Sequence, residues 1–177
     1  AMCSFWIQMK VNEQLAKGVR LKDMPDEWFT VPSDEAMKNS MVVVMGIFAC
    51  NRLIEIVVMP ELSLVGYTCG DMVLQKKLLS DSERALEWLM AETAEFPTIG
   101  IVGLPVVFAD RLYNCAAIFG QGQLWGIVPK SYIPNYGEFS ELRWWVSGYQ
   151  IKERMIRFAG EECPFGADLM FDLHAVE

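Results

Sequence analysis

Runs of apolar residues separated by turn-forming residues divide the chain into short strands and one clear helix. Buried strands are predicted at 41–45 and 56–59, where β-branched and other apolar residues follow one another. About ten residues separate these two runs, fewer than a parallel crossover usually needs, so either the connecting stretch is abnormal or the two strands are not neighbours. A third buried strand is predicted at 98–104, ending at Pro105.

The clearest helix is predicted at 81–95. Ser80 and Glu83 have capping-box spacing, and apolar residues then recur at intervals of three and four. The best hairpin pattern joins 112–119 to 123–128 through a short turn that contains two glycines. A helix between apolar strands, followed by a hairpin, predicts a mixed sheet of the α/β or α+β class.

Two further patterns bear on packing. Gly100 and Gly103 in the predicted third strand indicate that another backbone or side chain approaches closely. The Pro-, Gly- and aromatic-rich stretch 129–148 is typical of an ordered loop. Its Trp144-Trp145 pair suits either contact with another subunit or the core of that loop.

Composition narrows the class of protein. The 177 residues, 53% of them hydrophobic, fit one folded domain, and the net charge of −8 argues against nucleic acid as the main partner. The longest apolar stretch, 41–50, is far shorter than the roughly 18 residues of a membrane span. Nothing at the N-terminus resembles a secretory signal, so we expect a cytoplasmic protein.

Histidine and cysteine usage excludes several chemistries. His174 is the only histidine, which excludes histidine triads and multi-histidine zinc sites; we expect it in a loop or at a strand edge. The cysteines are odd in number and lack CxxC spacing, so we expect reduced thiols that mostly fill the core: Cys3, Cys50, Cys69, Cys115 and Cys163.

Two ionisable residues follow an apolar strand and a proline. Glu61 comes after 56–59 and Pro60, and Lys130 comes after 123–128 and Pro129. Each could be an ordinary turn or loop residue. If both are presented at the ends of adjacent strands, they form a charged pair in a pocket, where burial makes each need the other.

The residues around this pair resemble a known family. The segments 60–71 (PELSLVGYTCGD), 112–116 (LYNCA), 129–139 (PKSYIPNYGEF) and 163–169 (CPFGADL) are similar to the glutaminase domain of bacterial glutamine-dependent NAD synthetase. That domain belongs to the nitrilase, or carbon–nitrogen hydrolase, superfamily. The resemblance implies an α/β fold, a four-layer α-β-β-α nitrilase-like sandwich.

The resemblance also implies catalytic roles. Glu61 matches the general base of a Glu-Lys-Cys triad, and Lys130 matches the lysine that stabilises the oxyanion. Glu141 matches the second glutamate, which orients the lysine and the substrate, although Glu138 has similar spacing. Tyr136 matches a tyrosine that lines the glutamine pocket.

Two departures from the family pattern affect the expected domain limits. Residues 1–52 do not match the family, and 53–177 form the nitrilase-like domain, incomplete at both ends. In the family, the nucleophilic cysteine lies in a segment whose opening residues resemble 175–177, so the chain stops just short of that cysteine. Cys163 aligns with a loop position of the family and not with the nucleophile. We therefore expect this chain alone to be inactive.

The resulting hypothesis is the glutaminase part of a glutamine-dependent NAD synthetase, supplying ammonia for amidation of deamido-NAD. The expected partners are glutamine, a synthetase domain and further copies of the protein in a homo-oligomer. No cofactor or metal is expected in this domain, whereas ATP and magnesium are implied for the synthetase domain. The alternatives are a stand-alone amidase or nitrilase and a non-catalytic interaction subunit of the same fold.

Overall fold

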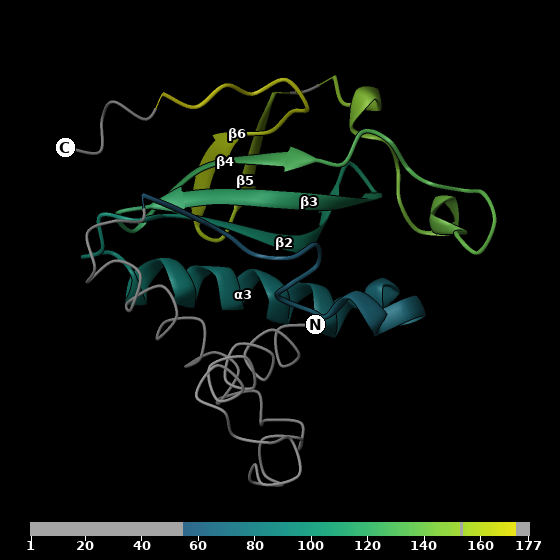
Figure 1. Ribbon diagram of the computed structural model, residues 1–177, viewed down its shortest axis with the longest axis horizontal. Helices are drawn as coiled ribbons and strands as arrows, with labels where there is room; N and C mark the ends of the chain where they lie inside the picture. The colour runs from purple at the N-terminus through teal and green to yellow at the C-terminus, as the bar shows by residue number, and fades with distance from the viewer. Residues whose placement is uncertain (1–54, 153, 173–177) are drawn as a thin grey trace, which may run out of the picture.

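A computed structural model describes residues 55–152 and 154–172, which form a mixed α/β structure (Figure 1). Its four-stranded sheet has the order β1 (Ile56–Val58), β2 (Ile99–Phe108), β3 (Arg111–Gly120) and β4 (Gln123–Pro129). β1 is parallel to β2, and the other neighbours are antiparallel. The expected α/β class and the hairpin are thus confirmed, while the four-layer arrangement stays a prediction.

Several expectations lie outside the described residues. These are the strand at 41–45, the whole unmatched segment 1–52 with its boundary, and His174. Within the part of the chain that is described, no helix has the length and apolar character to cross a membrane.

One helix and a second, two-stranded sheet complete the main core. α3 (Lys76–Glu92) runs alongside the four-stranded sheet, and the hairpin of β5 (Met155–Phe158) and β6 (Glu161–Pro164) crosses the direction of its strands (Figure 1). Buried side chains of α3, β2, β3, β4 and the hairpin form one apolar cluster. Sequence patterning did not predict β5 and β6, because four-residue strands give too short an alternation to recognise.

The helix begins earlier than predicted. α3 starts at Lys76 after Gln75, which makes no side-chain cap, so the capping-box interpretation of Ser80 and Glu83 is wrong. Both side chains bond elsewhere: the Ser80 hydroxyl donates to the Lys77 carbonyl (3.1 Å), and the Glu83 carboxylate accepts from the Ala159 amide (2.9 Å).

Pro105 does not end its strand, contrary to the sequence expectation. It lies inside β2, paired with Asn114 of β3. The Asn114 carbonyl accepts from the Lys130 amide (2.7 Å), so the backbone of Asn114 faces β4 and the nitrogen of Pro105 faces away from β3. On that side β1 has already ended, at the pairing of Val58 with Ile101. The missing N–H therefore removes no ladder hydrogen bond.

The two glycines of β2 do meet close neighbours, as predicted. A Cβ on Gly100 would lie 2.3 Å from the ring of Phe119, and one on Gly103 would lie 2.3 Å from the backbone nitrogen of Leu62. At Gly103 the neighbour is backbone, which cannot rotate away. Gly103 therefore lets the chain after β1 cross directly over β2.

The loop regions contain short 3-10 segments. They are η3 (Tyr67–Leu74), η4 (Glu141–Arg143) and η5 (Gly148–Gln150). Trp145, just after η4, is buried with Leu62 and Val73 in a second apolar cluster. Trp145 is therefore part of the core of the loop, which is the second of the two interpretations of the tryptophan pair.

We predict that Gly103→Ala destabilises the fold. The added methyl group would overlap the Leu62 backbone, and overpacking of this kind costs about 1–3 kcal/mol. Urea denaturation of the wild-type and variant chains measures the loss. Gly166→Ala is the matched control, because its nearest neighbours are side-chain atoms at 3.2 Å or more. Equal unfolding midpoints for Gly103→Ala and the wild type would contradict this account of the crossing.

Candidate active site

Glu61 is held by the turn that crosses β2. β1 ends at Val58, and the turn is fixed where the Gly103 amide donates to the Ser63 hydroxyl (3.0 Å) and the Leu64 amide donates to the Gly103 carbonyl (3.0 Å). Leu62 is buried and adopts a positive φ of 52°, which turns the chain sharply beside Glu61. The position of Glu61 therefore depends on backbone contacts to β2.

Lys130 is fixed by its backbone at the end of β4. Its amide donates to the Asn114 carbonyl (2.7 Å), and its own carbonyl accepts from the Gly148 amide (2.9 Å). Gly148 in turn packs against Pro129, where a Cβ would lie 2.8 Å from the Pro129 carbonyl oxygen. The side chain thus leaves from a backbone that is bonded on both sides.

The Lys130 ammonium lies between two carboxylates. Its Nζ donates to Glu61 Oε1 at 2.7 Å and to Glu141 Oε2 at 2.9 Å. The expected contact of Glu61 with Lys130 is confirmed, but the expectation that their strands are adjacent is wrong. β1 and β4 are separated by β2 and β3, and the contact forms because the chain after β1 crosses over β2.

Burial and charge act in opposite directions on Lys130. Desolvation lowers its pKa, but the hydrogen bonds and negative charges of Glu61 and Glu141 outweigh burial, so the pKa lies above the ordinary lysine value. Only 9% of the Glu141 side chain is exposed, against 37% for Glu61. Lys130 therefore stays charged at neutral pH. Of its two carboxylate partners, Glu61 is the more accessible to solvent.

Two neighbours of the cluster were not predicted from sequence. The side-chain amide of Asn114 donates to Glu61 Oε1 (2.5 Å), and the Tyr67 hydroxyl donates to Glu141 Oε1 (3.5 Å). Burial raises the pKa of Tyr67, and the charges of Glu61 and Glu141 raise it further. Asn114 could have been noticed as a polar residue within an apolar strand, whereas Tyr67 lies in the matched segment 60–71 but nothing there assigned it a role.

The structure separates Glu141 from Glu138. Glu141 contacts Lys130, whereas Glu138 lines the adjoining pocket. Tyr136 is exposed and does not line that pocket; its ring lies 5.9 Å from the ring of Phe139, which does. Tyr136 thus lies at the outer edge of the pocket, next to the ring of Phe139 that lines it.

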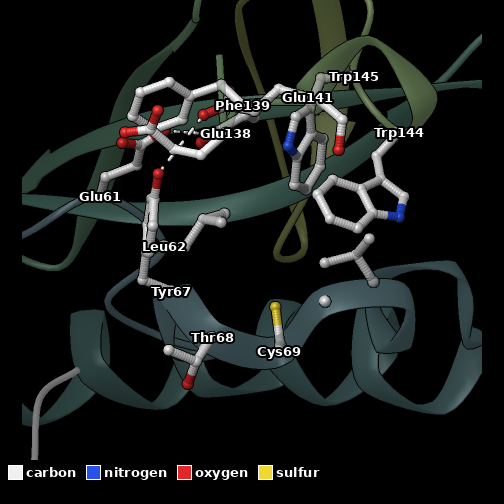
Figure 2. Close-up of a pocket in the computed structure, with 14 residues that line it drawn as sticks. Glu61, Leu62, Tyr67, Thr68, Cys69, Glu138, Phe139, Glu141, Trp144 and Trp145 are labelled. Carbon is white, nitrogen blue, oxygen red and sulfur yellow. Dashed lines mark hydrogen bonds between the residues drawn. The ribbon is translucent and has the colours of Figure 1, made fainter. Parts of the chain in front are cut away.

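A pocket of about 360 Å³ opens beside the cluster. Figure 2 shows Tyr67 pointing from η3 toward the glutamates, with the two tryptophans at the other end of the pocket. Its lining combines carboxylates and aromatic rings: Glu61, Tyr67, Cys69, Asn114, Glu138, Phe139, Glu141, Trp144 and Trp145 are among the residues that contribute. A small polar molecule could therefore contact Glu61 from within the pocket.

The cysteines in the described residues are free thiols. Cys115 and Cys163 are buried, as expected for core thiols, and burial raises the pKa of both, that of Cys163 to about 11. Cys69 is half-buried and lines the pocket, with a pKa that desolvation also raises. Since the thiolate is the nucleophilic form, none of the three is activated.

Comparison with known proteins adds sequence relatives and solved structures. No protein-family model matches the chain. Glutamine-dependent NAD(+) synthetase of Mycobacterium tuberculosis (strain ATCC 25618 / H37Rv) is 41% identical over 114 residues, which are 64% of this chain and 17% of that protein. The corresponding synthetase of Aquifex aeolicus is 34% identical over 137 residues, 77% of this chain and 23% of that protein.

The solved structures that resemble this chain include a synthetase of the same name. A glutamine-dependent NAD(+) synthetase from Cytophaga hutchinsonii superposes with a TM-score of 0.68 and 24% identity, over 76% of this chain and 23% of that one. The fold is that of the carbon–nitrogen hydrolases: one from Helicobacter pylori G27 gives 0.52 at 19% identity, over 66% of this chain and 41% of that one. By sequence, the chain is a homologue of a segment of glutamine-dependent NAD(+) synthetase, it spans less than a quarter of the length of these relatives, and the matches fit the glutaminase domain.

We predict that Glu141→Gln lowers the pKa of Lys130. The substitution removes one negative charge while burial of the ammonium remains. A raised pKa means that the cluster stabilises the fold below the unfolded lysine value of about 10.4 and that this contribution is lost as pH rises through the pKa of Lys130. Glu141→Gln should therefore also lower the pH at which this contribution is lost.

NMR titration of ¹³C-methylated lysines, with Lys130→Arg to assign the signal, measures this pKa. Glu138→Gln is the control, since it removes a pocket carboxylate outside the cluster. A Lys130 titration that is the same in Glu141→Gln and the wild type would show that Glu141 does not hold the ammonium.

Proposed function

We propose that this chain is the glutaminase part of a glutamine-dependent NAD synthetase. It hydrolyses the side-chain amide of glutamine and supplies ammonia for the amidation of deamido-NAD at a synthetase domain, which uses ATP and magnesium. The observation that carries the proposal is the Glu61–Lys130–Glu141 cluster beside a pocket, in a homologue of these synthetases. We further propose a cytoplasmic protein that assembles as a homo-oligomer.

In this proposal Glu61 is the general base. Both of its hydrogen bonds to Asn114 and Lys130 go to Oε1, and more than a third of the side chain is exposed toward the pocket. A thiol with an ordinary pKa of about 8.5 needs such a base at neutral pH. Glu141 is less suited to proton transfer, because it is buried and bonded to Lys130 and Tyr67.

The nucleophile in the proposal is the cysteine that follows the segment resembled by 175–177. Its thiol proton passes to Glu61 as sulfur attacks the amide carbon. The carbon–nitrogen bond then breaks, and the leaving nitrogen takes the proton from Glu61 and departs as ammonia. Water, deprotonated by Glu61, hydrolyses the thioester, releases glutamate and restores the thiol.

Lys130 would stabilise the oxyanion of each tetrahedral intermediate. A fixed donor aimed at developing negative charge is typically worth about 3 kcal/mol. The two carboxylates support this role, because they hold the ammonium charged and oriented before substrate binds. Tyr136 would contact the substrate at the outer edge of the pocket, beside Phe139.

The 177-residue chain alone should release no ammonia from glutamine. Without the thiol no acyl intermediate can form, and the pKa values of Cys69, Cys115 and Cys163 are all raised. Ammonia release measured on the purified chain tests this expectation. Turnover that is abolished by Lys130→Ala would contradict it and would indicate an unexpected nucleophile; among the described cysteines Cys69, which lines the pocket, would be the first to substitute.

The full-length protein provides the test of function. Glu61→Gln keeps the shape of the side chain and removes the base, so glutamine-dependent NAD synthesis should fall on the order of 10²-fold or more. Synthesis with ammonia should stay nearly unchanged, because Glu61 serves only the hydrolytic step. Both rates are measured on the same preparation.

Glu87→Gln, an exposed carboxylate on α3, is the matched control and should leave both rates unchanged. Equal losses of the two activities in Glu61→Gln would indicate a structural role for Glu61. If neither activity fell, the base would be another group, and Glu141 would be the next to substitute.

A further inference from the structure

Asp71 joins two segments that are far apart in the sequence. Its Oδ1 accepts from Arg143 Nη2 at 2.7 Å and from the indole Nε1 of Trp144 at 2.8 Å. The guanidinium carbon of Arg143 also lies 4.0 Å from the centre of the Trp144 ring. One carboxylate oxygen thus gathers two donors that already pack on each other.

The two donors directly follow the buried glutamate of the cluster. Arg143 is the last residue of η4, whose first residue is Glu141, and the Glu141 carbonyl accepts from the Trp144 and Trp145 amides, both at 3.0 Å. Backbone hydrogen bonds therefore connect the position of Glu141 to that of Arg143 and Trp144.

The same two segments meet again inside the molecule. Tyr67, at the start of η3, donates to the Glu141 carboxylate, and Val73, two residues after Asp71, is buried with Trp145. Figure 2 shows Trp144 and Trp145 side by side above the helical segment that carries Cys69. Asp71 is thus the outer connection between two segments that also meet through one polar and one apolar inner contact.

Asp71 and Arg143 are 73% and 53% exposed, and isolated exposed ion pairs add little stability. The pair also has a geometric effect. A single acceptor that binds a guanidinium and an indole N–H fixes the direction of both donors, and neither donor can satisfy the other.

We propose that Asp71 is a positioning residue that fastens η4 to η3 and thereby holds the Glu141 carboxylate on Lys130. The proposal adds a residue to the site that does not touch the substrate and acts through Arg143 and Trp144. The contacts described above support the positioning role itself. Only the expected effect on turnover rests on the proposed function.

Asp71→Asn tests this in the full-length protein. The neutral amide keeps an acceptor oxygen but loses the charge that holds the Arg143 guanidinium, so η4 should be held less tightly and Glu141 should loosen from Lys130. The Lys130 titration, followed by NMR of ¹³C-methylated lysines, should then shift in the same direction as in Glu141→Gln and by at least half as much. Glutamine hydrolysis should fall on the order of tenfold, mainly in kcat, because a small displacement of an oxyanion donor weakens the transition state more than the ground state.

Asp81→Asn is the matched control. Asp81 also pairs with two cations, Lys77 (2.7 Å) and Arg84, but on α3, away from the pocket. It should leave the Lys130 titration unchanged. Trp144→Phe keeps the ring and removes the donor, so it should give a smaller shift of the same sign; it also decides the case if Asp71→Asn fails to fold.

A folded Asp71→Asn protein with the wild-type Lys130 titration would overturn the positioning role, whatever its turnover. The failure of the proposed function has a different signature. In that case the wild type hydrolyses no glutamine, while Asp71→Asn still shifts the Lys130 titration and the positioning role stands.

Discussion

The ammonium of Lys130 between the carboxylates of Glu61 and Glu141 is the interaction on which the arrangement of the site depends. The three residues come from separate parts of the chain, and burial would disfavour each charge alone. Removing either carboxylate leaves the ammonium with less compensation, whereas removing the ammonium leaves two like charges close together. The cluster is therefore stable only as a set, which couples the turn after β1 to the loop that carries Glu141.

Backbone packing makes that set possible. The turn that carries Glu61 reaches β3 and β4 because Gly103 has no side chain to hold it away from β2. Asn114 then has two functions: its carbonyl fixes the Lys130 amide, and its side-chain amide contacts Glu61. A residue of β3 thus sets the distance between a group delivered by β1 and one delivered by β4. Hydrogen bonds to regular strands, and not only the loops, therefore hold the site in place.

Sequence patterns predicted the parts of this arrangement that are local. Apolar runs located β1, most of β2 and the hairpin, and the proline after each of two strands marked Glu61 and Lys130. What failed depended on distant contacts. The start of α3 could not be read from Ser80 and Glu83, because the Glu83 carboxylate bonds to Ala159, more than seventy residues later. Pro105 predicts a strand end, because nothing local shows that its nitrogen faces the side where β1 has ended. Tyr67 gave no signal because its partner, Glu141, is brought near only by the folded loop.

The cluster also bears on the alternative of a non-catalytic interaction subunit. An interaction subunit that no longer catalyses would have no use for a buried glutamate, because desolvation of Glu141 is costly and a neutral residue would pack as well. Here Glu141 is bonded to Lys130, Tyr67 contacts the same carboxylate, and Glu61 keeps an exposed flank toward the pocket. Such an arrangement stabilises a cation at the edge of a cavity where negative charge can develop, which favours an amide hydrolase over a purely structural domain.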